Sequence, residues 1–267
     1  MIDYIRLETI DLVLAGLLLL INGGLSLALR LGIETRLAIA AARMVVQLLA
    51  VGLVLKALFA SASPWLTALA ALAMILVAGR EIVARQDRRL AGWWSYGLGV
   101  GSMAFAAVIV TLFALTTQIQ ADPWYDPRFA LPILGMVLGN TMTGIALGLD
   151  TLTTAVTRDR ASIEAQLALG ATRFVALRQA SRTALRSALM PMVNAMAAAG
   201  LVSLPGMMTG QILSGVDPVE ATKYQILIMF LIAGGTAFGA VIAVQAAVYR
   251  LSDGRHRLRT DRLTAVE

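Results

Sequence analysis

Long stretches without any charged residue constrain this 267-residue chain more than any other feature. A helix needs about 20 residues to cross the hydrocarbon core of a bilayer, and each stretch is near or above that length. Such stretches predict membrane-spanning helices, because a segment in lipid must be apolar and must satisfy its own backbone hydrogen bonds. They are Leu12–Leu29, Ala57–Gly79, Leu90–Ala121, Phe129–Leu149, Ser187–Val216 and Tyr224–Tyr249.

The composition supports the same interpretation, with 58% hydrophobic and only 14% charged residues. A soluble protein carries roughly 25% charged residues, and a soluble fold of this length could not bury so much apolar surface. The 23 glycines suit transmembrane helices, in which small residues let backbones approach closely. We therefore expect an all-α integral membrane protein with a single membrane domain over residues 1–267.

One more span is expected between Arg43 and Lys56, whose long side chains can reach the membrane surface from a short apolar segment. This gives seven transmembrane helices. The expected spans are about 11–31, 37–60, 65–80, 93–117, 129–149, 187–210 and 224–249.

The orientation follows from Lys and Arg. With the N-terminus outside, 18 of the 22 Lys and Arg residues fall on the inside. Because cytoplasmic loops carry the excess of positive charge, we expect the N-terminus outside and the C-terminus inside. Contact with anionic lipid head groups then accounts for the net charge of +6, and no nucleic-acid partner is expected.

The residues offer no support for enzymatic chemistry. There is no cysteine, and the single histidine, His256, lies in a basic C-terminal tail at 250–267. No phosphate-binding loop of the form G-x4-G-K-[ST] is present, so the chain cannot hydrolyse ATP by itself. We expect a protein that is not an enzyme, and we assign it no catalytic, cofactor-binding or metal residues.

The sizeable segment outside the predicted spans covers about residues 150–186. Within it, Ser162 can cap a helix of about two turns that Gly170 ends in a left-handed conformation. Downstream arginines recur every four residues and share one helix face, and they need an anionic partner, either lipid head groups or a protein. This arginine row consists of Arg178, Arg182 and Arg186.

The short helix resembles the coupling loop of ABC transporter permeases, in which Glu-Ala is followed after four residues by Gly. In those proteins it docks into a groove on a cytoplasmic ATPase, so the resemblance implies an ATPase partner. The proline that follows in ordinary importers is not at its usual spacing, since the next proline here is Pro191. The coupling residues by this resemblance are Glu164, Ala165, Leu169, Gly170, Ala171 and Thr172.

A longer motif covers Gly200–Gly215 and continues to Ile226. It closely resembles the FetB family of ABC permeases (UPF0014), which is associated with iron export. That family includes plant STAR-type membrane subunits, linked to aluminium tolerance and UDP-glucose transport. Gly139–Met142 and Leu169–Thr172 match the same family.

The resemblance implies a permease subunit of a bacterial inner membrane that exports iron by alternating access. Two copies of the chain would assemble with two copies of a cytoplasmic ABC ATPase, which would bind ATP and Mg²⁺. This chain would bind no cofactor itself.

A candidate substrate pathway lies where Pro205 is expected to interrupt a helix. Broken helices are tolerated inside a membrane where they face protein or a water-filled cavity. The break is therefore either part of a substrate path or a kinked helix packed on its neighbours. The candidate pathway residues are Asn140, Met142, Asn194, Ser203, Pro205, Gly206, Met207, Met208 and Gln211.

The residues leave the substrate open. Ferrous iron is ordinarily held by carboxylate or imidazole, and no carboxylate lies deep within a predicted span. Another metal or UDP-glucose is therefore the alternative substrate of such a permease. An ion-coupled secondary transporter or channel is the alternative from another class, and the scarcity of intramembrane charged residues counts against it.

Overall fold

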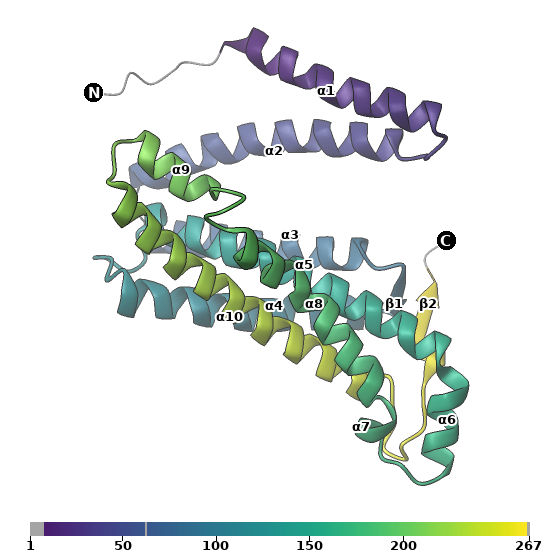
Figure 1. The fold of residues 1–267 in the computed structure, drawn as a ribbon. Helices are drawn as coiled ribbons and strands as arrows, with labels where there is room; N and C mark the ends of the chain where they lie inside the picture. Colours follow the sequence, from purple (N-terminus) through teal and green to yellow (C-terminus); the bar gives the residue numbers. More distant parts are fainter. Residues whose placement is uncertain (1–7, 62, 266–267) are drawn as a thin grey trace. The chain divides into compact units, whose positions relative to one another are not determined.

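The computed structural model describes residues 8–61 and 63–265, and this part of the chain is mostly helical (Figure 1). The chain forms two compact units, Met1–Ala62 and Ser63–Glu267. The first unit holds two helices, and the second holds all the other elements.

The first unit is a pair of helices, α1 (Thr9–Ala28) and α2 (Glu34–Ser61). Ser26 near the end of α1 is buried, and its hydroxyl donates to the Glu34 carboxylate over 2.8 Å. The same hydroxyl accepts the backbone N–H of Ile33 over 3.3 Å. These two bonds tie the connecting turn to both helices.

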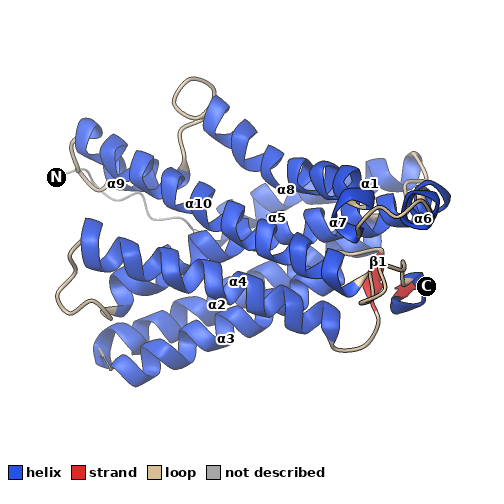
Figure 2. Cartoon of the chain, turned by 90° about the horizontal axis from the view of Figure 1, so that it is seen from below, coloured by secondary structure: helices blue, strands red, loops and turns tan. Residues whose placement is uncertain are grey.

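The second unit is a bundle of long helices with short elements at its ends (Figures 1 and 2). The long helices are α3 (Pro64–Ala84), α4 (Trp94–Phe113), α5 (Pro127–Arg158), α8 (Arg178–Ala198) and α10 (Pro218–Arg250). The short elements are β1 (Arg88–Leu90), the π-helix η1 (Ala114–Gln118), α6 (Arg160–Ala168), α7 (Arg173–Ala176), α9 (Gly206–Leu213), η2 (Thr260–Arg262) and β2 (Leu263–Ala265). In both views α9 lies at one end of this bundle, and α6 and α7 lie at the other.

Helices α5 and α10 begin with the same local chemistry, an aspartate followed by a proline. The Asp126 carboxylate accepts the N–H of Arg128 over 2.9 Å, and Asp217 accepts those of Val219 and Glu220 over 2.9 and 3.3 Å. Proline suits the first helical position because the N–H that it lacks would have no partner there. Helix α10 therefore begins at Pro218, six residues before the expected start of the last span at about 224.

Glycines set the close packing at the centre of this bundle. A Cβ atom at Gly144 of α5 would lie 2.6 Å from Cγ2 of Thr236, and one at Gly239 of α10 would lie 2.5 Å from Cγ2 of Thr141. Both distances are shorter than any ordinary contact between carbon atoms, so only glycine fits. Small residues therefore bring α5 and α10 together, as expected for packed transmembrane helices.

Within the described residues, six helices are long and apolar enough to cross a membrane. They match six of the seven expected spans, with boundaries shifted by up to nine residues at one end of α5. They are Ile10–Ala28, Glu34–Ser61, Pro64–Ala84, Trp94–Gln118, Pro127–Arg158 and Pro218–Arg250. The membrane-embedded, all-helical class is confirmed.

The expected span at 187–210 is wrong as a single helix. The structure starts α8 at Arg178, ends it at Ala198, and places a break before α9. Helix α5 also continues to Arg158, so both ends of the expected coupling segment at about 150–186 are extensions of bundle helices. The count of seven spans and the orientation stay predictions.

The basic tail folds back onto the start of α4. Strand β2 pairs antiparallel with β1, with Leu263 opposite Leu90. The N–H of Ala91 also donates to the carbonyl of Arg262 over 2.7 Å. The last two residues of the predicted tail at 250–267 lie outside the described residues.

Candidate functional site

A tight loop separates α8 from α9, and we call this loop the break. The N–H groups of Val202 and Ser203 both donate to the carbonyl of Ala198, over 3.0 and 3.2 Å. Gly200 has φ +86°, a left-handed conformation that glycine adopts without steric cost. Gly200 thus ends the helical path well before Pro205, which corrects the expectation that the proline interrupts a continuous helix.

Pro205 instead starts α9. It is the N-cap residue, and its carbonyl accepts the N–H and the hydroxyl of Thr209 over 3.0 and 3.2 Å. At the other end Gly215 (φ +92°) closes a Schellman motif, in which the N–H of Val216 donates to the carbonyl of Gln211 over 3.0 Å. Helix α9 is therefore well defined at both ends, although none of its residues is buried.

A cavity of about 590 Å³ lies between the end of α8, the break and the first turns of α10. Three thioether side chains line it, from Met196, Met208 and Met229, together with the polar side chains of Thr222 and Gln225. The hydroxyl of Thr222 lies 4.0 Å from Sδ of Met208. Oε1 of Gln225 is buried and has no hydrogen-bond partner among the described residues. We call this space the methionine cavity.

The structure brings part of the predicted pathway residues to this cavity. Pro205 and Met208 line it, and Gly206 opens α9 beside them. Met207 packs against the bundle core. Gln211, one turn further along α9, has a buried Oε1 that finds no partner within the described part of the chain.

The other predicted pathway residues do not line the methionine cavity. Asn140 is exposed on α5, and its amide donates to the carbonyl of Met136 over 2.9 Å within the same helix. Met142 packs against the core, Asn194 is exposed near the end of α8, and Ser203 is exposed in the break. Their part in a pathway stays a prediction.

Thr222 and Gln225 line the cavity although the sequence does not single them out. The expected last span began at Tyr224, so both residues fell at its edge. Gln225 carries a usable signal, because a polar side chain within a charge-free stretch usually faces the interior of a bundle.

At the opposite end of the bundle, α6 and α7 form what we call the α6–α7 corner, residues 160–176. Ile163 is buried and Leu167 packs against the core, so one face of α6 is anchored. The expected short helix is confirmed. It begins at Arg160, however, so Ser162 lies within the helix and is not its cap.

Gly170 stops α6 as expected. Its φ is +91°, and the N–H of Ala171 donates to the carbonyl of Gln166 over 3.0 Å, which completes a Schellman motif. Thr172 then precedes α7, and its carbonyl accepts the N–H of Ala176 over 3.0 Å. The chain therefore turns sharply at the tip of the corner.

The outer face of the α6–α7 corner is apolar and exposed. Leu169 is 89% exposed, and Phe174 and Val175 are 54% and 58% exposed. Ala165 is exposed as well. Exposed apolar side chains close together along the chain suit a site of protein contact.

Charged groups surround this apolar face. Glu164 is half-buried and accepts a hydrogen bond from Nε of Arg160 over 2.7 Å. Two hydrogen bonds from Arg158 lower the pKa of the Asp159 carboxyl below its ordinary value. No ion pair in the part of the chain that the structure describes involves the arginine row, so its charge is uncompensated.

Long apolar helices, a helix broken beside a cavity, and an exposed corner at the far end define a polytopic helical membrane protein of the permease class. The chain belongs to a family described as "Uncharacterised protein family (UPF0014)", whose model matches residues 9–251.

Three relatives illustrate the range of the family. A UPF0014 membrane protein of Synechocystis is 39% identical over 82% of this chain and 83% of its own length. The "Probable iron export permease protein FetB" of Escherichia coli is 31% identical over 86% of each chain. The UPF0014 membrane protein STAR2 of rice is 33% identical over 82% of this chain and 75% of its own. No solved structure shows a significant match to this chain.

Proposed function

We propose that this chain is the membrane-spanning permease subunit of an ABC transporter that exports iron from a bacterial cell. ATP and Mg²⁺ would be bound by a separate cytoplasmic ATPase, and two copies of each subunit would form the transporter. The observation that carries the proposal is the exposed apolar face of the α6–α7 corner.

The connections of the corner support its role as the coupling element. Helix α5 passes into α6 through the single residue Asp159, and α7 passes into α8 through Leu177. A partner that gripped Leu169 and its neighbours would therefore hold two long bundle helices at once.

Iron as the substrate is supported by the relative whose printed name is "Probable iron export permease protein FetB". Within the described residues, no group of three or more His, Cys, Asp or Glu side chains lies close enough to hold a metal ion. The methionine cavity would therefore contact the passing metal weakly. Weak contact suits a transport path, because a substrate held too tightly does not leave.

The same lining supports a second candidate, an organic substrate such as UDP-glucose. The cavity volume of about 590 Å³ falls within the roughly 300–1,000 Å³ typical of small-molecule sites. Its amide and hydroxyl groups would suit the hydroxyls of a sugar, whereas the diphosphate would need cationic groups from outside the cavity, because no charged side chain lines it. A different metal ion is the remaining alternative within the same permease mechanism.

The coupling role is tested by Leu169→Asp, with Leu213→Asp on α9 as the matched control because it is also exposed, at 65%. We expect Leu169→Asp to lose the ATPase during purification from native membranes, since a buried unpaired carboxylate is strongly unfavourable at a contact. Leu213→Asp should retain it. Equal retention by both variants would sink the coupling proposal.

The substrate is tested by ATP hydrolysis of the purified complex in lipid nanodiscs. Stimulation by ferrous iron alone supports iron export, and stimulation by UDP-glucose alone moves the substrate to a nucleotide sugar. If no ATPase accompanies the protein, the ABC mechanism is wrong and an ion-coupled transporter takes its place.

A further inference from the structure

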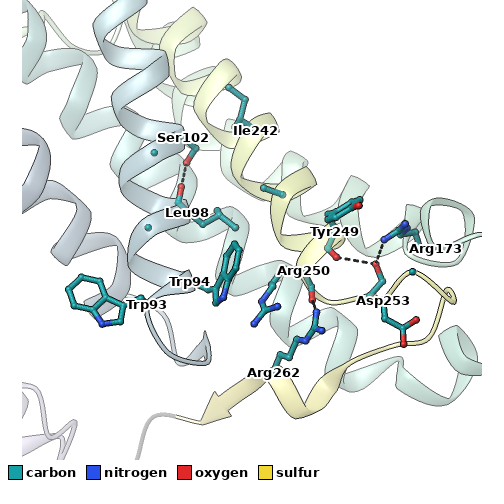
Figure 3. Close-up of a pocket in the computed structure, with 15 residues that line it drawn as sticks. Trp93, Trp94, Leu98, Ser102, Arg173, Ile242, Tyr249, Arg250, Asp253 and Arg262 are labelled. Carbon is teal, nitrogen blue, oxygen red and sulfur yellow. Dashed lines mark hydrogen bonds between the residues drawn. The ribbon is translucent and has the colours of Figure 1, made fainter.

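A second cavity, of about 870 Å³, lies between the start of α4, the end of α10 and the tail (Figure 3). Its mouth carries aromatic and arginine side chains, and its floor is made of small and aliphatic residues. We call it the basic groove. The residues that the argument uses are Trp94, Gly97, Gly101, Arg173, Arg250 and Arg262.

Two of its arginines are held in place by aromatic rings. The guanidinium of Arg250 lies 4.4 Å from the centre of the Trp94 ring, and that of Arg173 lies 4.5 Å from the centre of the Tyr249 ring. A stacked guanidinium keeps its N–H donors at its edge, where they can bind an anion. Arg262 joins them, anchored by a 2.7 Å hydrogen bond from Nη1 to the carbonyl of Arg250.

The basic groove has an unbalanced positive charge. Its one lining carboxylate, Asp253, already accepts the backbone N–H groups of Arg255 and Arg257 and the Nε of Arg257, each over 2.9 Å. No carboxylate in the described part of the chain forms an ion pair with Arg173 or Arg250. The groove therefore suits an anionic ligand.

The floor of the groove suits a hydrocarbon chain. Gly97 and Gly101 lie one turn apart on α4, and a Cβ atom at either position would meet no other atom within 4 Å. Leu98, Ile242 and Ala246 complete an apolar surface beside them. Tryptophan and tyrosine at the mouth are typical of the level at which lipid head groups meet the apolar membrane core.

We propose that the basic groove binds an anionic phospholipid, with its phosphate between Arg173, Arg250 and Arg262 and an acyl chain over Gly97 and Gly101. Pockets that place basic side chains at the ends of transmembrane helices recognise such head groups through charge. A free phosphate would use the arginines but not the floor. This site shares no lining residue with the methionine cavity and meets the α6–α7 corner at Arg173 alone. Its test measures lipid binding and not transport, so the proposal stands whatever the substrate is.

Native mass spectrometry of the full chain tests the proposal, with dioleoyl phosphatidylglycerol and dioleoyl phosphatidylcholine as probes. We expect preferential retention of phosphatidylglycerol. Gly101→Leu should fill the floor, and Arg250→Gln should remove a charged donor. Arg250→Gln should weaken phosphatidylglycerol binding by about tenfold, the scale of one hydrogen bond to a charged group. Gly101→Leu should weaken it as well, because the added side chain takes the place of the acyl chain. Gly234→Leu is the matched control, because Gly234 lies on α10 outside the groove and its Cβ position is also open.

Equal retention of the two lipids would overturn the proposal, since it would mean ordinary solvation by bulk lipid. Displacement of the lipid by inorganic phosphate, combined with normal binding by Gly101→Leu, would instead define a free-anion site and also overturn it. Gly97→Leu fills the same floor, so it gives the same test if Gly101→Leu does not fold.

Discussion

Glycine has opposite roles in two regions of the same bundle. At the centre of α5 and α10, Gly144 and Gly239 touch neighbouring helices so closely that a single added carbon would clash. In α9 beside the break, Gly206 and Gly210 have no atom within 4 Å of the position that a Cβ would take. Glycine therefore holds the centre tightly packed, and it leaves the region of the break open.

Unpaired polar groups differ between the same two regions. Among the described residues, Thr141 and Thr236 have buried hydroxyls without hydrogen-bond partners at the tightly packed centre, and neither residue lines the methionine cavity. Gln225 has an unpaired buried oxygen on the wall of the methionine cavity. A ligand in the methionine cavity would reach Gln225 and not the two threonines. We therefore expect the centre to be rigid, and we expect substrate contact at the break if the proposed function holds.

The largest expected effect comes from adding one carbon in each region. Gly144→Ala should lower the free energy of unfolding by about 1–3 kcal/mol, because overpacking forces neighbouring atoms apart. Gly210→Ala should be neutral or stabilising by up to about 0.5–1 kcal/mol, because alanine favours a helix. Thermal unfolding of the purified protein in detergent measures both. Equal changes in melting temperature for the two variants would contradict the difference in packing between the two regions.

A substitution that alters the backbone of the break should reduce transport and leave the stability of the protein nearly unchanged. Gly200→Ala forces a side chain into a left-handed conformation at a local cost of roughly 1–2 kcal/mol. Because the loop is exposed, we expect little change in the melting temperature but a several-fold loss of substrate-stimulated ATP hydrolysis. A large fall in melting temperature with unchanged transport would show that the loop belongs to the rigid scaffold.

Removing an unpaired polar group tests which region contacts substrate. Gln225→Leu and Thr236→Val should each leave stability unchanged or raise it by up to roughly 1 kcal/mol, since a buried group without a partner is costly. Transport should fall only for Gln225→Leu. Transport assays in nanodiscs decide the matter, and a loss in Thr236→Val alone would place the pathway in the centre of the bundle.

The smallest effect concerns the tail, which packs on the scaffold. Hydrogen bonds from Arg257 and Arg255 lower the pKa of Asp253 from 3.8 to about 2. A carboxyl with a lowered pKa stabilises the folded tail above the unfolded pKa, and that stabilisation is lost as pH falls through about 2. Limited proteolysis should find the tail protected at pH 5 and cleavable near pH 2. Asp253→Asn should be cleavable at both.

Hydropathy and caps were enough to predict much of the bundle. Six of the spans follow from charge-free stretches, although the expected last span began six residues after the actual start of α10 at Pro218. The stop at Gly170 follows from its residue type, because few residues other than glycine tolerate φ near +91°.

The sequence misplaced the start of α8, because the hydropathy changes along this helix while its helical backbone continues. Arginines at the start of α8 and apolar residues at its end suggest two segments, yet one helix runs from Arg178 to Ala198 and continues through Pro191. The pairing of β1 with β2 was also missed, because strands of three residues carry no periodic pattern. The two cavities depend on tertiary packing, which local patterns do not encode.

Helix α8 has a mechanical consequence. Its 21 residues span about 32 Å at 1.5 Å per residue, close to the thickness of a bilayer core. One end joins the α6–α7 corner through Leu177, and the last turns carry Met196 to the methionine cavity. If an ATPase binds the corner as proposed, its movement would reach the methionine cavity through this single helix. Pro191 is the one proline inside α8, and it is the point at which the helix would bend during such a movement.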